Sequence, residues 1–161
     1  MDIETTLSWP VGPDDVVAVR CDHSYLEVLC RRTGAIEHDV QVDGLSTTVT
    51  RVMPTEGFPD FARRLTGERL TLVERTTWAA AADADGSRRA EVTMHVDGAP
   101  VTSATTVVVR PGGGGSVETV SGRVTAKVPL IGGRIEKAVL PALEAAAAAQ
   151  VDAYTQWRTA R

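Results

Sequence analysis

The chain has 161 residues, of which 43% are hydrophobic and 24% are charged, and this balance is typical of a soluble globular domain. We expect one domain over residues 1–161, because a chain of this length can bury a core without disulfides or metals. A formal net charge of −4 argues against a nucleic-acid partner, since phosphate backbones reward clustered Lys and Arg. Neither a signal peptide nor a membrane span of about 18 apolar residues is visible, so a cytoplasmic location is expected.

The first third of the chain predicts a strand followed by two short helices. Apolar and polar residues alternate over 3–9, which is typical of a strand. Pro13-Asp14-Asp15 indicates a helix start, because proline and acidic residues suit the first turn. Two short helices are therefore predicted at about 13–20 and 22–33.

Six further strands are predicted after these helices. Alternation over 36–42 indicates the first, and Asp43-Gly44 is a strong hairpin signal before the second, which runs to about Met53. Residues 54–67 contain prolines and glycines, and a short turn of helix is expected there at 61–64. The four glycines at 112–115 are interpreted as a hairpin tip, because a phosphate loop needs a following helix and Lys. The other four strands are predicted at 68–81, 88–97, 101–110 and 116–128.

The C-terminal segment predicts one long helix over about 132–158. Gly132-Gly133 lets the backbone change direction after a strand, and no glycine follows in the remaining residues. Pro141 falls on the polar face, where we expect a bend or a local break. The tryptophans Trp9, Trp78 and Trp157 lie on apolar faces, so all three are expected to be substantially buried. The apolar face of the helix comprises Ile135, Val139, Ala142, Leu143, Ala146, Gln150, Ala153, Tyr154 and Trp157.

These elements predict an α+β fold in which a seven-stranded antiparallel sheet wraps around the C-terminal helix. Strands joined by tight turns run antiparallel, and the helix needs one large apolar surface to lie against. A curled sheet and a helix rarely fill the space between them, so a cavity is expected. The alanines at 145–149 leave room for a ligand; alternatively, they simply let the strands approach more closely.

Three stretches carry a resemblance to a known family: Glu74–Trp78, Asp97–Val101, and Pro129–Glu136 together with Trp157. With these residues the sequence resembles an uncharacterised actinobacterial family, a domain of unknown function in the START-like (SRPBCC) helix-grip superfamily. That superfamily includes lipid-transfer domains, the birch-pollen allergen, and polyketide aromatases and cyclases. The resemblance spans nearly the whole chain. It implies the helix-grip fold and a hydrophobic ligand between sheet and helix, and it supplies no catalytic residues.

Ten residues are expected to line the cavity, assigned by the faces of their predicted elements. Gln150 lies within the apolar face of the helix, and burying its amide without partners would cost about 1–3 kcal/mol. It is either a polar anchor for a ligand or the partner of a side chain on a facing strand. His38 is either a general base or ligand partner, or a hydrogen-bonded interior histidine. The ten are Tyr25, Leu26, His38, Val40, Trp78, Met94, Ala147, Gln150, Val151 and Tyr154.

No metal or cofactor is expected, because no set of His, Cys, Asp and Glu has the spacing of metal ligands. Cys21 and Cys30 are predicted to be free thiols, since nine residues of helix separate them by ~13 Å, too far for a disulfide.

Three functions remain open from the sequence. The first is noncatalytic binding or transport of a small hydrophobic ligand such as a lipid, an isoprenoid or a polyketide-like molecule. The second is a cyclase- or aromatase-type enzyme that uses His38, Gln150 and either Tyr25 or Tyr154. The third is a module without a ligand that binds a protein partner of unspecified identity. A dry cavity favours the first, converging polar side chains favour the second, and a filled interior favours the third.

Overall fold

The computed structural model describes all 161 residues and contains every element that the sequence predicts. Seven strands and a long C-terminal helix follow the expected order, and the two short helices lie between the first two strands. The short turn of helix expected at 61–64 is a helix of seven residues. The elements are β1 Asp2–Trp9, α1 Pro13–Arg20, α2 His23–Arg32, β2 Glu37–Asp43, β3 Ser46–Pro54, α3 Asp60–Thr66, β4 Arg69–Trp78, β5 Arg88–Val96, β6 Val101–Gly112, β7 Gly115–Ala126 and α4 Gly132–Thr159.

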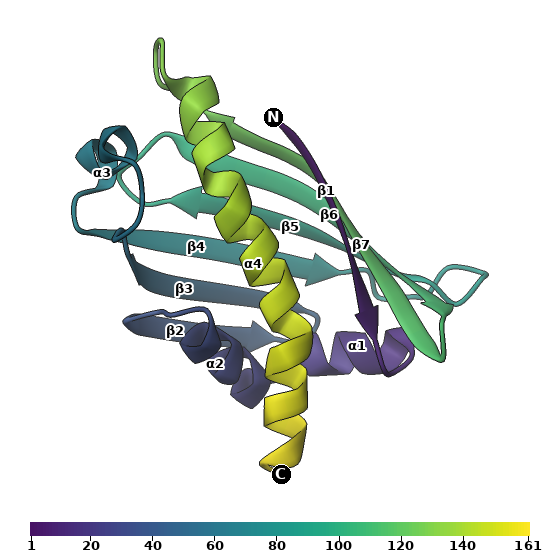
Figure 1. Ribbon diagram of the computed structural model, residues 1–161. Helices are drawn as coiled ribbons and strands as arrows, with labels where there is room; N and C mark the ends of the chain where they lie inside the picture. Colours follow the sequence, from purple (N-terminus) through teal and green to yellow (C-terminus); the bar gives the residue numbers. More distant parts are fainter.

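The seven strands form one antiparallel sheet in the order β1-β7-β6-β5-β4-β3-β2. Helix α4 crosses one face of this sheet and packs against β1, β7 and α2 (Figure 1). Helices α1 and α2 lie at the end of the sheet near the C-terminus of α4, and α3 lies at the opposite end (Figure 1). The predicted fold, a sheet wrapped around a long C-terminal helix, is confirmed. No helix is both long and apolar enough to cross a membrane.

Glycines are required at two places in the hairpin of β6 and β7: at the turn between the strands, and within β7 where the backbone of β6 comes close. Gly113 and Gly114 both have positive φ, 62° and 79°, and they form the two-residue turn between the paired residues Gly112 and Gly115. This confirms the predicted hairpin tip, because such turns need positive φ at both central positions. Further along β7, a Cβ at Gly122 would overlap the carbonyl oxygen of Ala104 on β6, so only glycine fits.

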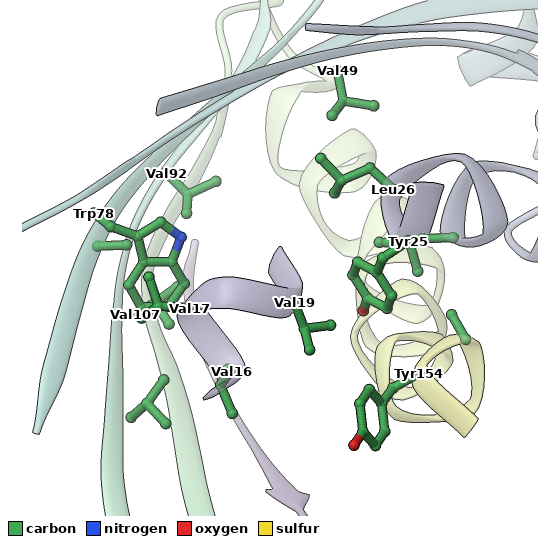
Figure 2. Packing of buried hydrophobic residues seen from close by; sticks show 14 of the residues in the cluster. Val16, Val17, Val19, Tyr25, Leu26, Val49, Trp78, Val92, Val107 and Tyr154 are labelled. Atoms are coloured by element: carbon green, nitrogen blue, oxygen red, sulfur yellow. The ribbon is translucent and has the colours of Figure 1, made fainter. Parts of the chain in front are cut away.

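Two separate hydrophobic clusters lie under the two ends of α4. In the main core, α1 and α2 insert between the sheet and the C-terminal part of α4, as Figure 2 shows for Val17, Tyr25, Trp78 and Tyr154. The smaller core lies beneath the start of α4 and comprises Leu70, Val96, Val101, Ala126 and Ile135. The main core comprises Trp9, Val16, Val17, Val19, Tyr25, Leu26, Leu29, Cys30, Val40, Val49, Trp78, Ala90, Val92, Val107, Val109, Ala153 and Tyr154.

All three tryptophans are largely covered by the protein, but to different extents. Trp9 and Trp78 are 2% and 3% exposed, whereas Trp157 is only partly buried. The last turns of α4 pack on α2 there, and the Trp157 ring contacts that of Tyr25 edge-on, with 6.0 Å between centroids. Its indole N–H donates to the Ser24 hydroxyl at 2.8 Å. Trp157 therefore closes the edge of the main core and is not a member of it.

Helix α4 is unbroken from Gly132 to Thr159, so the local break expected at Pro141 does not occur. Proline removes one backbone N–H and so leaves the carbonyl one turn earlier without its helical partner. Pro141 is exposed, and so is Lys137 four residues before it. The unpaired carbonyl therefore lies on the solvent side of the helix, where water can satisfy it.

Candidate functional site: a two-chambered cavity

Between the two hydrophobic cores, the middle of α4 lies over a cavity with two adjoining chambers. The larger, which we call the apolar chamber, has a volume of about 470 Å³. The smaller, the polar chamber, has a volume of about 120 Å³. Six residues line both chambers and so place them side by side: Thr33, Arg51, Glu74, Met94, Leu143 and Ala146.

The apolar chamber is bounded by strands β3 to β7 on one side and by α4 on the other. Of its 21 lining residues 14 are hydrophobic, and four of these are alanines of α4. Small side chains at these positions leave space beneath the helix, which is the first of the two interpretations given for the alanine run. The hydrophobic lining is Met53, Phe58, Leu70, Leu72, Met94, Val96, Val101, Val124, Val139, Ala142, Leu143, Ala145, Ala146 and Ala149.

The polar chamber is lined by 23 residues, of which 11 are hydrophobic and 12 are polar or charged, and most of the 12 lie on the sheet. Thr47 pairs with Thr76 across β3 and β4, and Val92 of β5 connects Thr76 to Thr105 of β6, so three threonines lie in one row. Sequence reasoning did not single them out, because threonine occurs on both faces of these strands. The polar lining is Glu4, Thr5, Arg20, Thr33, Thr47, Arg51, Glu74, Thr76, Ser103, Thr105, Glu144 and Gln150.

A charged pair, Arg51 of β3 and Glu74 of β4, lies where the two chambers meet. Arg51 is 7% exposed, and its Nη1 lies 3.7 Å from a carboxylate oxygen of Glu74. Burial by itself would lower the pKa of Arg51, but the Glu74 carboxylate and the Cys30 thiol outweigh it and the pKa is raised. Arg51 therefore stays charged inside the protein, and its Nε is buried without a hydrogen-bond partner.

A second buried pair, Arg20 of α1 and Glu118 of β7, closes the floor of the polar chamber. The fully buried Glu118 carboxylate accepts from Arg20 Nη1 at 2.6 Å and from the Trp9 indole N–H at 2.8 Å. Burial would lower the pKa of Arg20, but the Glu118 carboxylate reverses the shift and raises it. The Arg20 guanidinium also lies 5.4 Å from the Trp78 ring centroid. Both partners are thus satisfied, unlike those of the Arg51–Glu74 pair.

Gln150 lines the polar chamber, as its place on the helix predicted. Its side-chain oxygen is buried and has no hydrogen-bond partner, so the facing strand does not satisfy it. Its backbone carbonyl instead accepts from the Tyr25 hydroxyl at 2.9 Å. The use of this amide as a ligand anchor stays a prediction, now with an unpaired acceptor to support it.

Of the ten residues expected to line the cavity, Leu26, Met94, Ala147 and Gln150 do so. The expected lining is corrected at the other six. Four of them fill the main core instead, and Val151 packs against it. The physical reason is that α1 and α2 occupy the space beneath the C-terminal part of α4, which moves the cavity toward the middle of the helix. Those in the main core are Tyr25, Val40, Trp78 and Tyr154.

His38 lies on the edge strand β2, outside both chambers. Its Nε2 is 3.9 Å from a carboxylate oxygen of Glu27 on α2. Tyr25 is also set apart, because burial raises the pKa of its hydroxyl far above the ordinary value and its O–H donates to Gln150. The set considered for acid–base chemistry, His38 and Gln150 with either Tyr25 or Tyr154, is therefore not brought together in one chamber, since Tyr154 also lies in the main core. No three His, Cys, Asp or Glu side chains are placed to hold a metal ion.

A family of proteins of unknown function, DUF2505, matches residues 4–157 of the chain. The chain belongs to the DUF2505 family. None of the curated proteins compared with it matches. The resemblance quoted from the sequence is thus confirmed at the level of the family. The match covers both cores, nearly all of α4 and every residue that lines the chambers except Ile3.

Solved structures share the helix-grip fold of this DUF2505 chain. TTHA0849 from Thermus thermophilus has a TM-score of 0.66 and 15% identity, over 99% of this chain and 98% of that one. The STAR-related lipid transfer protein from Xanthomonas axonopodis has a TM-score of 0.58 and 14% identity, over 90% and 82%. The ZhuI aromatase/cyclase from Streptomyces sp. R1128 has a TM-score of 0.56 and 13% identity, over 95% and 90%. At these identities the likeness establishes the fold alone.

Proposed function

We propose that this protein binds or carries a small hydrophobic ligand, without catalysing a reaction, in the cavity between the sheet and α4. The polar side chains that converge on the polar chamber favour a second candidate, a cyclase- or aromatase-type enzyme. The observation that carries the proposal is the apolar chamber of about 470 Å³, with 14 hydrophobic residues among the 21 that line it. The chamber is partly open to solvent, so a ligand can enter it from the surface. Its volume lies in the range of about 300–1,000 Å³ that ligand pockets usually have.

The chamber also has the right surroundings for an apolar molecule. It lies between the two hydrophobic cores, so the fold is held on both sides and does not depend on filling the space between them. A ligand that buries its apolar surface there gains about 25 cal/mol per Å². A lipid, an isoprenoid or a polyketide-like molecule would fit this description. The names of two similar structures lend support, because a lipid transfer protein and an aromatase/cyclase both have small molecules as ligands or substrates.

Two measurements on the purified full chain test this proposal together. Native mass spectrometry is expected to show an excess mass that extraction with organic solvent removes, which would identify a ligand retained from the expression host. The extracted protein is then titrated with the neutral fluorescent probe N-phenyl-1-naphthylamine, whose emission rises in apolar surroundings. Saturable binding of one probe per chain is the expected result. A protein that retains nothing and shows no saturable rise in emission would refute the proposal.

A further inference from the structure

The junction of the two chambers holds a hydrogen-bond donor and an acceptor that do not satisfy each other. The separation of 3.7 Å between Arg51 Nη1 and Glu74 is longer than a hydrogen bond, and Arg51 Nε has no partner at all. The Glu74 side chain is 25% exposed and faces both chambers. Buried polar groups are nearly always paired, so an unpaired guanidinium N–H beside a cavity points to a ligand that completes it.

The charges around this junction disfavour an anionic ligand. A ligand carboxylate near Arg51 would also lie near Glu74, so attraction and repulsion of similar size would cancel and the cost of removing the carboxylate from water would remain. Two other cations line the chambers, but each has a carboxylate partner: Arg20 lies 2.6 Å from Glu118, and Arg32 lies 3.7 Å from Asp152. Glu4 and Glu144, both exposed and both lining the polar chamber, add negative charge on its solvent side.

A cationic ligand is disfavoured in turn, because an ammonium group carries only donors, cannot accept from the Arg51 guanidinium and is repelled by its charge. A hydroxyl group can both donate and accept a hydrogen bond, so a single alcohol can pair with the Arg51 guanidinium and with the Glu74 carboxylate. We propose that the cavity selects an uncharged alcohol over the carboxylic acid of the same skeleton. Its hydroxyl accepts from a terminal guanidinium N–H of Arg51 and donates to the Glu74 carboxylate, and its apolar body lies in the apolar chamber. This inference rests on the proposed function.

The test compares decan-1-ol with decanoate at pH 8, each displacing N-phenyl-1-naphthylamine from the full chain. Decan-1-ol is expected to displace the probe at about one tenth of the concentration that decanoate requires, or at a still lower concentration. Equal displacement by the two would overturn the selectivity, because the two compounds differ only in the head group. Failure of the probe itself to bind the wild type would instead refute the proposed function, so the two failures are distinguishable.

A substitution at the junction tests the cause of the selectivity. Glu74→Gln keeps a side chain of the same size and removes the repelling charge, so decanoate is expected to bind about tenfold more tightly to this variant than to the wild type. Glu91→Gln, on β5 where Glu91 is exposed and contacts the Thr106 hydroxyl, is the matched control and should leave the ratio unchanged. A Glu74→Gln protein that folds and keeps the wild-type ratio would overturn the role of Glu74. If it does not fold, the wild-type ratio alone decides the proposal.

Discussion

Replacing Glu118 with leucine is expected to lower the free energy of unfolding by about 3–5 kcal/mol. The change removes the fully buried carboxylate that accepts from Arg20 and from Trp9, at 2.6 and 2.8 Å. Arg20 is 8% exposed, so it would be left as a buried charge without a counterion. Equilibrium urea unfolding, followed by tryptophan fluorescence and by circular dichroism at constant pH, measures the loss. It would be a large share of a domain's usual stability of about 5–15 kcal/mol.

A double-mutant cycle separates the ion pair from general packing. Arg20→Met alone should also be strongly destabilising, because it leaves Glu118 as the unpaired charge. The double variant, Arg20→Met with Glu118→Leu, removes both charges and should lose less free energy than the two single variants added together. Additive losses would contradict this account, because they would mean that Arg20 and Glu118 stabilise the fold independently. Trp9 loses its hydrogen-bond acceptor both in Glu118→Leu and in the double variant. The cost of this loss therefore cancels when the free energy lost by the double variant is compared with the sum of the two single losses.

The second prediction concerns the cavity itself: Ala146→Trp should abolish binding of N-phenyl-1-naphthylamine while the protein stays folded. Ala146 lies in the middle of α4 and lines both chambers, so a larger side chain there occupies the space proposed for the ligand. Overpacking a filled core costs about 1–3 kcal/mol, but an indole that enters an existing cavity should cost little. Fluorescence titration gives the binding, and a urea melt gives the stability.

The matched control for this substitution is Ala148→Trp, two residues further along the same helix. Ala148 is exposed and lines neither chamber, so its replacement should leave binding of the probe unchanged. Wild-type binding by the Ala146→Trp protein would place the site elsewhere. A loss of stability above about 3 kcal/mol in that variant would show that the middle of α4 packs on a filled core.

Most of the fold could be predicted because its signals are local. Alternation of period two marked the strands, and paired glycines such as Gly113-Gly114 marked turns that need positive φ. Pro13 and the acidic residues after it marked the start of α1. The lesser burial of Trp157 could not be predicted, because an apolar helical face says which side is covered, and not how far the covering element extends.

The site was harder to predict because it depends on contacts between distant elements. Nothing in the pattern of Val16 and Val17 shows that α1 inserts beneath α4, and this insertion displaced the expected cavity lining. The Arg51–Glu74 pair depends on the register between β3 and β4. Val49 lies opposite Glu74, so Arg51, two residues after Val49, is the diagonal neighbour of Glu74 on the same face. A long connection containing α3 joins these strands, and no tight turn fixes their register in the sequence.

The most direct test is an NMR titration of the methyl-labelled full chain with decan-1-ol. If the cavity holds the ligand, nuclear Overhauser contacts should join the protons of the decanol chain to the methyl groups of Leu143 and Ala146, which line both chambers. The exposed methyl group of Ala148 should show none. Contacts confined to Ala148 and other exposed methyl groups, with no contact to Leu143 or Ala146, would contradict the account.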